Sequence, residues 1–294
     1  MIESSSKEND HRPVTPSEED CCGNSCNPCI FDVHKKLVEE WEKRKLDKIK
    51  RVYNENCLSL LQYKRFIVRA IKRSSEDCII IDIECGSENK NELVFMSPGQ
   101  HIMMRLTSTS KPYTPISWNK QSIKLLIKLY ENGVASNCIK QLKLRDDIFI
   151  RGPYGDFKYT RNSYKNVVML SIGSGIAALY PIAVSIVKDD LEDTKIKWIS
   201  GFRSLSHVAL KDELRALTDY WNFECLLCLS QEKDANITGI QTINSRLNDK
   251  IINNVLDSYD SESVLILICG TPEFNASMEK LVVKKNFSNH YSFR

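Results

Sequence analysis

One short segment, Lys111–Ser117, combines several groups that could bind a flat ring carrying phosphates. Its two prolines favour an extended backbone, because proline fixes its own φ and pushes the preceding residue away from the helical region. Tyr113 then offers an aromatic face, Thr114 and Ser117 offer hydroxyls, and Lys111 offers a positive charge. The same composition suits an ordinary edge strand, where proline is tolerated. Taken alone, the segment leaves both interpretations open.

A second group of residues, Gly173-Ser174-Gly175, lies between an apolar run and a helical stretch. Glycines at such a junction let the backbone approach a diphosphate, and the free amides of the helix start face its charge. With Ala178 the junction fits the loose G-x-G-x-x-A pattern, which is weak alone. The next strand ends at Arg203 without the acidic residue that ordinary dehydrogenases place there. The alternative is simple close packing of a helix on a strand.

Cys269-Gly270-Thr271-Pro272 follows the last apolar strand and precedes a helix. This position is the lip of a parallel sheet, where ligands bind. A lone buried cysteine is more often a small hydrophobic residue. No histidine adjoins Cys269 in the sequence, so we do not predict covalent catalysis.

Four cysteines, Cys21, Cys22, Cys26 and Cys29, fall within nine residues near the start of the chain. Tetrahedral thiolate sites for Zn²⁺ commonly use such spacings, although two separated pairs are more usual than one compact cluster. Zinc, a redox or docking role, and incidental thiols remain three open interpretations.

Residues 62–160 hold many short strands and one short helix, which predicts a small antiparallel β-barrel. The expected strands are Tyr63–Arg73, Cys78–Glu84, His101–Leu106, Ser122–Tyr130 and Asp147–Arg151, and the expected helix is Gly133–Leu144.

The pattern changes near Lys165, because apolar strands now alternate with helices over residues 161–294. This alternation predicts a parallel sheet covered on both faces, with ligands at the carboxyl ends of the strands. The expected strands are Val167–Ile172, Lys195–Gly201, Phe223–Ser230 and Val264–Cys269, and the expected helices are Ile176–Lys188, Val208–Tyr220, Thr242–Asn248 and Glu273–Lys284.

Two further segments precede the barrel. Residues 1–20 are polar and are expected to be disordered. Residues 21–55 contain the cysteine cluster and a predicted helix, Phe31–Tyr53, with one apolar face.

The totals exclude several classes of protein. Among 294 residues, 41 Lys and Arg against 38 Asp and Glu leave a charge of +3, which argues against a nucleic-acid-binding surface. No apolar run approaches the roughly 18 residues that span a bilayer, and the first twenty residues lack a signal-peptide pattern. Eleven scattered cysteines indicate reduced thiols rather than a secreted disulfide framework. We therefore expect a cytoplasmic protein without a transmembrane segment. We also expect a monomer.

Several short motifs follow one another along the chain. They are Lys111–Ser117, Ile127–Tyr130, Gly133–Ser136, Arg151–Gly155, Ile172–Ala178, Gly201–Arg203, Asp212–Leu214 and Cys269–Pro272. In order and spacing they resemble the cytochrome b5 reductase family of the ferredoxin reductase superfamily, from about Tyr63 to Arg294. The stretch around Cys22–Cys29 is similar to a short oxidoreductase-like segment that precedes the reductase domains in some relatives.

This resemblance implies an FAD-binding β-barrel followed by an NAD-binding α/β domain. It also implies an enzyme in which FAD takes a hydride from NADH and passes single electrons to a haem protein such as cytochrome b5. Thr114, near the reactive flavin nitrogen, and Cys269, beside the nicotinamide, would be the catalytic positions. The implied cofactor-binding set is Lys111, Pro112, Tyr113, Thr114, Ser117, Ile127, Lys128, Tyr130, Gly133, Val134, Ala135, Ser136, Gly173, Ser174, Gly175, Ala177, Gly270, Thr271 and Pro272.

The chain departs from the family pattern at several of these positions. Lys111 replaces an arginine and loses its bidentate geometry. Val134 replaces a basic residue, and Ile172, Ala177 and Ala178 replace Gly, Thr and Pro. An alternative is therefore a weakened or inactive relative that acts as an interaction protein through its N-terminal cysteine segment. Because Arg203 lies near the expected adenosine ribose, NADPH is the alternative nucleotide.

Overall fold

The structure, a computed structural model, describes residues 12–21, 29–47, 56–87, 92–106 and 109–293. The helices are α1 (Ile30–Asp47), α2 (Val134–Lys140), α3 (Ile176–Val187), α4 (Lys211–Leu217), α5 (Asp249–Leu256) and α6 (Pro272–Lys284), with 3-10 turns η1 (Glu18–Asp20), η2 (Gly173–Gly175) and η3 (Leu205–His207). The strands are β1 (Lys64–Arg73), β2 (Cys78–Cys85), β3 (His101–Leu106), β4 (Thr109–Tyr113), β5 (Pro115–Asn119), β6 (Ser122–Lys128), β7 (Asp147–Tyr154), β8 (Asn166–Ile172), β9 (Lys195–Phe202), β10 (Phe223–Leu229), β11 (Gln241–Ile243), β12 (Val264–Cys269) and β13 (His290–Phe293).

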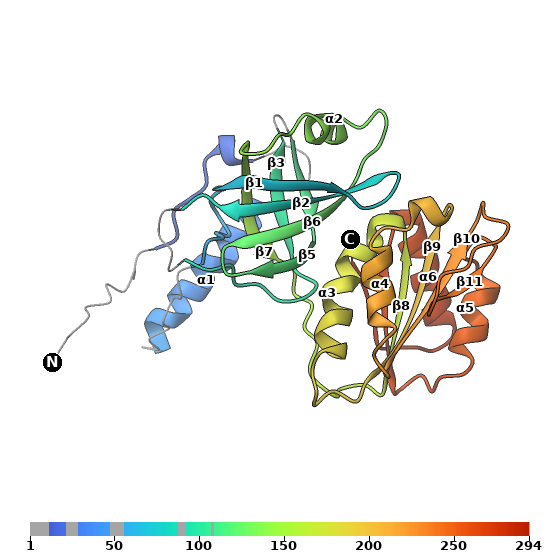
Figure 1. The fold of residues 1–294 in the computed structure, drawn as a ribbon. Helices are drawn as coiled ribbons and strands as arrows, with labels where there is room; N and C mark the ends of the chain where they lie inside the picture. Colours follow the sequence, from blue (N-terminus) through green and yellow to red (C-terminus); the bar gives the residue numbers. More distant parts are fainter. Residues whose placement is uncertain (1–11, 22–28, 48–55, 88–91, 107–108, 294) are drawn as a thin grey trace.

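The first sheet is antiparallel and has seven strands in the order β4-β3-β7-β1-β2-β6-β5 (Figure 1). Its two edge strands, β4 and β5, are consecutive in the chain and are joined only by Thr114. The sheet must therefore curl until its edges meet at this residue, which makes it the predicted barrel. Inward-facing side chains such as Phe66, Ile81, Ile123 and Ile150 are fully buried and form its core. β-branched residues fit this pleated, buried surface well.

The position of β4 and β5 reconciles the two interpretations of Lys111–Ser117. Both strands lie at sheet edges, and each carries one of the prolines, Pro112 and Pro115. An edge strand tolerates proline because one side of its backbone needs no ladder hydrogen bond. The segment is thus an edge, and the same edge closes the barrel.

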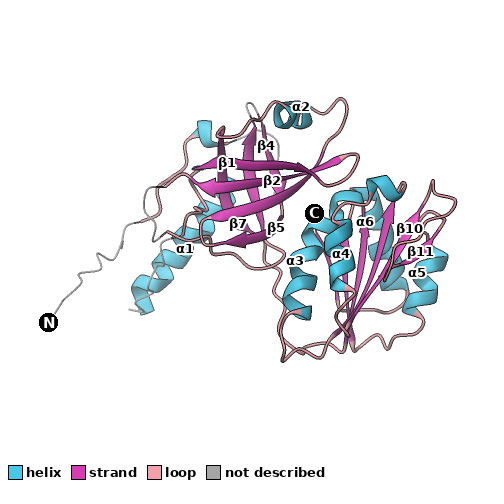
Figure 2. Ribbon diagram, viewed as in Figure 1, coloured by secondary structure: helices cyan, strands magenta, loops and turns pink. Residues whose placement is uncertain are grey.

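The second sheet is parallel, with six strands in the order β11-β10-β9-β8-β12-β13. Helices lie on both faces of this sheet (Figure 2). Alternate residues of β8 pack against different helices: Val167 and Met169 with α3 and α4, Val168 and Leu170 with α5 and α6. A sheet covered on both faces needs such continuous apolar strands. The predicted fold class, a β-barrel followed by a parallel α/β domain, is confirmed.

The two sheets are held together by apolar contacts. Helix α3 lies against β5, and Ile116 and Leu126 of the barrel belong to the same buried cluster as Ile176 and Leu179 of α3. This shared core fixes the end of the parallel sheet beside the barrel.

Several predicted elements differ in extent, and one is wrong. The predicted helix Thr242–Asn248 does not form, because Thr242 and Ile243 pair with β10 as strand β11. The helix begins at Asp249 instead, where the Asn248 side chain accepts a hydrogen bond from the Ile251 amide. The helices predicted at Gly133–Leu144 and Val208–Tyr220 shorten to α2 and α4, and β13 was not predicted.

Helix α1 packs on the outer face of the barrel, where Val33 meets Met103 and Tyr154. The predicted helix Phe31–Tyr53 extends beyond residue 47, outside the described residues. None of the helices in the described ranges combines the length and apolar character required to cross a bilayer.

Candidate cofactor site between the two sheets

The strand order of the parallel sheet defines where a ligand can bind. β9 lies on one side of β8 and β12 on the other, so the chain direction of the connections reverses between β8 and β12. Such a switch point leaves a crevice at the carboxyl ends of the strands. A cavity of about 810 Å³ opens there. The barrel contributes Asp77, Cys78, Lys128 and Tyr130 to its wall.

The two glycines after β8 serve different purposes. Gly173 has φ +53°, and a Cβ added there would meet only the Lys128 Nζ, at 3.6 Å. Its backbone therefore lies open to the cleft. A Cβ at Gly175 would lie 2.1 Å from the carbonyl oxygen of Cys269, so this glycine permits close packing of the turn against β12. Both interpretations of the glycine motif therefore apply: ligand approach at Gly173 and close packing at Gly175.

Ile172 lines the cleft despite its bulk. Its side chain lies over two glycines: a Cβ at Gly201 would be 3.2 Å from Cγ2, and a Cβ at Gly270 would be 2.6 Å from Cγ1. The missing side chains of Gly201 and Gly270 therefore make room for Ile172. This arrangement keeps Ile172 against the sheet at the floor of the cleft.

Lys128 carries a positive charge to the cleft from the end of β6. Its Nζ forms an ion pair with Asp77 Oδ2 at 3.0 Å. Burial opposes ionisation of Asp77, but the hydrogen bond and charge of Lys128, together with contacts from Cys78 and Ser75, hold the pKa of this carboxyl below its usual value. The pair orients Lys128 beside the Gly173 turn.

The predicted flavin positions on the barrel fall into two groups. Tyr113 is half-buried, and burial, with smaller effects of Cys138 and Tyr130, raises the pKa of its phenol to about 12. Buried Ser136 accepts a hydrogen bond from the Tyr130 amide at 2.9 Å, which ties the end of β6 to the start of α2. The phenol is therefore neutral, and the region around Tyr130 is held in place.

The other predicted positions are more scattered. Lys111, Pro112 and Ser117 are exposed on the edge strands, and Thr114 is half-buried between them. Val134 is exposed, Gly133 and Ala135 are half-buried, Ile127 is buried in the barrel core, and Ala177 is buried in α3. The side chains of Ile127 and Ala177 pack into cores, which leaves their backbones as the parts nearer a ligand.

At the end of β12, Gly270, Thr271 and Pro272 line the cleft together with Gly173 and Ser174. Thr271 caps α6 by accepting a hydrogen bond from the Phe274 amide at 3.3 Å. Burial raises the pKa of Cys269 to about 12, so its thiol stays neutral.

Several cleft residues were not singled out in the sequence. They line the cleft beside Arg203, which the sequence analysis did single out, and they are His207, Arg246, Ser230 and Gln231. All follow the carboxyl end of a parallel strand, and that position is the signal that could have found them.

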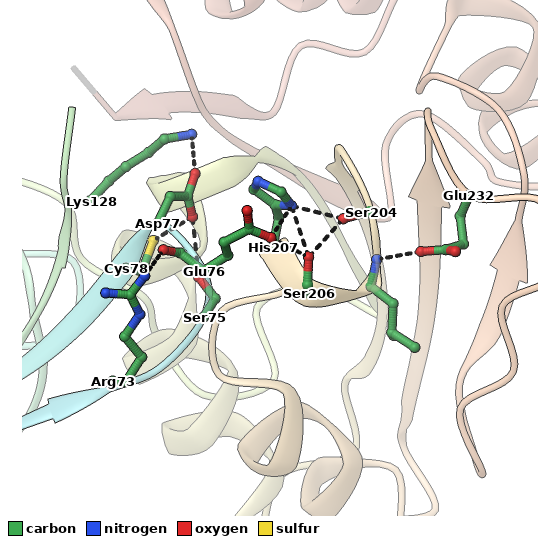
Figure 3. Close-up of polar contacts among 11 residues, drawn as sticks. Arg73, Ser75, Glu76, Asp77, Cys78, Lys128, Ser204, Ser206, His207 and Glu232 are labelled. Carbon is green, nitrogen blue, oxygen red and sulfur yellow. Dashed lines mark hydrogen bonds and ion pairs between the residues drawn. The ribbon is translucent and has the colours of Figure 1, made fainter. Parts of the chain in front are cut away.

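A polar network joins His207 to the barrel (Figure 3). The Ser206 hydroxyl donates to Glu76 Oε2 at 2.6 Å, and the Glu76 amide donates to the Ser206 carbonyl at 2.8 Å. Ser204 Oγ lies 2.7 Å from His207 Nδ1. The loop between β1 and β2 is therefore hydrogen-bonded to the turn that carries His207.

Two of the cysteines proposed as zinc ligands, Cys22 and Cys26, lie outside the described residues, while Cys21 and Cys29 have free thiols. A different group, the thiols of Cys57 and Cys85 with the Glu92 carboxylate, gathers within 4.8 Å. Burial, with the neighbouring Cys85, raises the pKa of Cys57 to about 12.

Three family models match the chain. They are an oxidoreductase FAD-binding domain over residues 65–159, an oxidoreductase NAD-binding domain over residues 169–280, and an N-terminal oxidoreductase-like protein segment over residues 10–50.

Relatives extend these matches over most of the chain. A human protein, NADH-cytochrome b5 reductase-like, is 27% identical over 289 residues, covering 92% of this chain and 90% of its own. NADH-cytochrome b5 reductase 1 of Scheffersomyces stipitis is 34% identical over 204 residues, covering 65% and 68%.

Solved structures show the same fold. The CS-b5R domains of human Ncb5or superpose with a TM-score of 0.68 at 20% identity, over 84% of this chain and 71% of that one. The cytochrome b5 reductase domain of Ulva prolifera nitrate reductase gives 0.67 at 18%, over 81% and 100%. With its FAD-binding and NAD-binding oxidoreductase domains in this order, the chain belongs to the cytochrome b5 reductase family.

Proposed function

We propose that this flavoprotein oxidises NADH in the cleft between its two sheets and passes single electrons to a haem protein such as cytochrome b5. The observation that carries the proposal is the cleft itself. It lies at the switch point of the parallel sheet, and the end of β6 faces the open Gly173 turn across it. The proposed division is a flavin domain at residues 62–160 and a nucleotide domain at residues 161–294.

On the barrel, we assign the flavin to the surface around Tyr113, Thr114 and Tyr130. A neutral, half-buried phenol at Tyr113 is suited to lie against an aromatic ring. Thr114 supplies a hydroxyl where the two edges meet, and exposed Lys111 supplies a charge for the pyrophosphate, with the amides of the Gly133–Ser136 turn. Bound FAD would supply hydride acceptance and one-electron release.

In the nucleotide domain, we assign the dinucleotide diphosphate to the turn Gly173-Ser174-Gly175. The open backbone of Gly173 and the nearby Lys128 support this assignment. Gly270, Thr271 and Pro272 border the same cleft. Cys269 would then contribute a neutral thiol beside the nicotinamide rather than a nucleophile.

The nucleotide preference depends on the far end of the cleft. Exposed Arg203 and Arg246 line it, and neither forms an ion pair within the part of the chain that the structure describes. Two guanidinium groups without ion-pair partners suit the 2′-phosphate of NADPH. The relatives, in contrast, are named as NADH enzymes, which favours NADH. NADPH therefore remains the alternative donor.

The acceptor follows from the relatives, whose names include cytochrome b5. We further propose a cytoplasmic monomer. The scattered thiols support a reducing compartment, and those the structure describes are all free. Light scattering of the purified protein tests its oligomeric state.

Purified protein provides the decisive experiment. We expect it to be yellow, to bleach with NADH under anaerobic conditions, and to reduce cytochrome b5. Protein that stays colourless after addition of FAD would rule out the flavoenzyme. Reduction by NADH without electron transfer to cytochrome b5 would keep the reductase and reject the acceptor.

The alternative, an inactive relative acting through its N-terminal cysteine segment, predicts yellow protein that NADH does not bleach. Packing of α1 on the barrel means that this segment is attached to the flavin domain. Zinc at Cys21, Cys22, Cys26 and Cys29 also remains a proposal, and metal analysis of the full chain against a variant with all four changed to serine tests it.

A further inference from the structure

His207 is the residue of the cleft wall with the most specific surroundings. It is the last residue of η3 (Leu205–His207), five residues after the carboxyl end of β9, and its side chain is only 13% exposed. It lines the cleft together with Gly173 and Lys128. A half-buried imidazole at a nucleotide-binding edge has two nitrogens with distinct partners, and these decide what it can bind.

Nδ1 is directed to the protein. It lies 2.7 Å from Ser204 Oγ and 3.2 Å from Ser206 Oγ. Ser206 donates its own proton to Glu76, so it has none to offer Nδ1. The Ser204 hydroxyl can serve Nδ1 either as donor or as acceptor.

Nε2 is the nitrogen left for a ligand. In Figure 3 it lies on the side of the ring away from Ser204 and Ser206. When the Ser204 hydroxyl donates to Nδ1, the proton of the neutral ring is on Nε2. When the ring is doubly protonated, Nε2 again carries a proton, and Glu76, 3.7 Å from Nδ1, balances the charge. An anion in the cleft selects either of these two states.

Charges of both signs line the cleft: Lys128, Arg203 and Arg246 are basic, and Asp77, Asp249 and Glu273 are acidic. Lys128 reaches the Gly173 turn from the barrel, and its own partner is Asp77. Glu232, which follows β10, accepts a hydrogen bond from the Leu205 amide at 2.9 Å and is not among the residues that line the cleft. A diphosphate at the Gly173 turn would thus meet Lys128 from β6 and His207 from η3.

We propose that His207 binds the diphosphate of the nicotinamide dinucleotide through Nε2–H, with Ser204 positioning the ring through Nδ1. The proposal rests on the proposed function, because it assumes that a dinucleotide occupies the cleft. Since Glu76 belongs to the loop between β1 and β2, the barrel would help to orient a residue that binds the nucleotide.

Calorimetry on the full FAD-loaded chain tests the contact with NAD⁺ and with ADP-ribose, which retains the diphosphate but lacks the nicotinamide. We expect His207→Leu to weaken both ligands at least tenfold, because a charge-assisted hydrogen bond is lost. His207→Gln should stay within about threefold of the wild type, because its amide nitrogen can replace Nε2–H. His290→Gln, on β13 outside the cleft lining, is the matched control and should change neither affinity.

The outcomes separate the two proposals. Equal affinities of wild type and His207→Leu would overturn the diphosphate contact while leaving the reductase intact. Loss of NAD⁺ binding with unchanged ADP-ribose binding would also overturn it, because the contact would then be to the nicotinamide half. A wild-type chain that binds neither ligand would overturn the proposed function, and this inference with it.

A spectroscopic readout is independent of affinity. The chain has five histidines, so long-range ¹H–¹⁵N spectra are simple, and His207→Gln identifies the signal of His207. We expect ADP-ribose to bring His207 into a state with a proton on Nε2. An unprotonated Nε2 in the complex would overturn the proposal. Ser204→Ala should weaken ADP-ribose binding less than His207→Leu does, because Ser204 only positions the ring.

Discussion

At the residue scale, the barrel places the positive charge of Lys128 beside the parallel sheet, and Asp77 forms an ion pair with it. Lys128 Nζ faces the backbone of Gly173, and Asp77 holds it there. Replacing Lys128 removes the positive charge that an anion in the cleft would meet. Replacing Asp77 instead leaves Lys128 without its ion-pair partner, so the two changes should affect anion binding in opposite directions.

We predict that Lys128→Met raises the dissociation constant of NADH about tenfold, since one charged contact is worth about 1.5 kcal/mol. Asp77→Asn should leave NADH binding equal or tighter. The flavin content of both proteins, measured from the visible spectrum, is the control. Weaker binding in Asp77→Asn would contradict this prediction and would mean that the hold of Asp77 on Lys128 matters more than the charge that it neutralises.

The same pair predicts a pH effect on stability. Because the folded-state pKa of Asp77 is lowered, its contribution is present above the unfolded value of about 3.9 and is lost as pH falls through the lower folded value. For a partly exposed pair the contribution is about 1 kcal/mol. Urea unfolding of the wild type and Asp77→Asn at pH 7 and pH 3 measures it, and the difference between the two proteins should shrink in acid.

Arg203 and Arg246 carry a separate prediction about nucleotide choice. Replacing both with glutamine should raise the KM for NADPH at least tenfold and change that for NADH less than threefold, because only NADPH has the additional phosphate. Steady-state kinetics with each nucleotide measures the ratio. Arg215→Gln is the matched control, since Arg215 is an exposed arginine of α4 outside the cleft lining, and it should change neither KM. An equal loss for both nucleotides in the arginine variant would assign the pair to the shared part of the molecule.

At the element scale, the turn between β8 and α3 has two roles: Gly173 leaves its backbone open to a ligand, and Gly175 allows close packing against β12. Gly175→Ala places a methyl group 2.1 Å from the Cys269 carbonyl oxygen, which the buried backbone cannot avoid. We expect a loss of at least about 3 kcal/mol in the free energy of unfolding, as for other severe overpacking.

Gly173→Ala is the matched variant, because its methyl group has room and meets only the flexible end of Lys128. Its cost should be about 1 kcal/mol, from the positive φ of this residue. It should nevertheless weaken NADH binding, because the open backbone faces the cleft. Denaturant unfolding and NADH titration of both variants measure these effects. If Gly173→Ala were less stable than Gly175→Ala, the assignment of Gly175 to packing and Gly173 to ligand binding would be wrong.

Elements were predictable from the sequence wherever the apolar pattern was continuous. The strand Val264–Cys269 has the predicted bounds, because its residues are buried on both faces. The helix predicted over Thr242–Asn248 was wrong, because the pairing of Thr242 and Ile243 with β10 is a tertiary contact that no local pattern reports. The cap at Asn248 was visible in the sequence and was overlooked.

The site shows the same division. Glycine-rich turns and the Tyr-Thr segment carry local signals, so their positions were predictable. His207 and Arg246 carry no motif of their own. Only their place after the carboxyl ends of β9 and β11 could have indicated them, and β11 was not predicted. The loop between β1 and β2 becomes part of the site solely through the docking of the two sheets.

At the scale of the whole molecule, function depends on the fixed placement of the barrel against the parallel sheet. The apolar contact of α3 with β5 and the hydrogen bonds of the loop between β1 and β2 join the barrel to the nucleotide domain at two places. A reductase of this kind needs two rings in contact, and proximity of this sort contributes strongly to catalysis. Stability of the two cores is therefore a condition for activity.

Buried thiols connect that stability to alkaline pH. Burial raises the pKa of Cys57, Cys78 and Cys225 to about 12 and that of Cys228 to about 11. Unfolded thiols ionise near 8.5, so above that pH the unfolded chain loses protons that the folded chain keeps. The free energy of unfolding should then fall by about 1.4 kcal/mol per pH unit for each such thiol. Urea unfolding between pH 7 and 10, under reducing conditions, measures the slope. Cys225→Ala should be less stable at pH 7 yet have a shallower slope, and an unchanged slope would mean that Cys225 ionises within the folded protein.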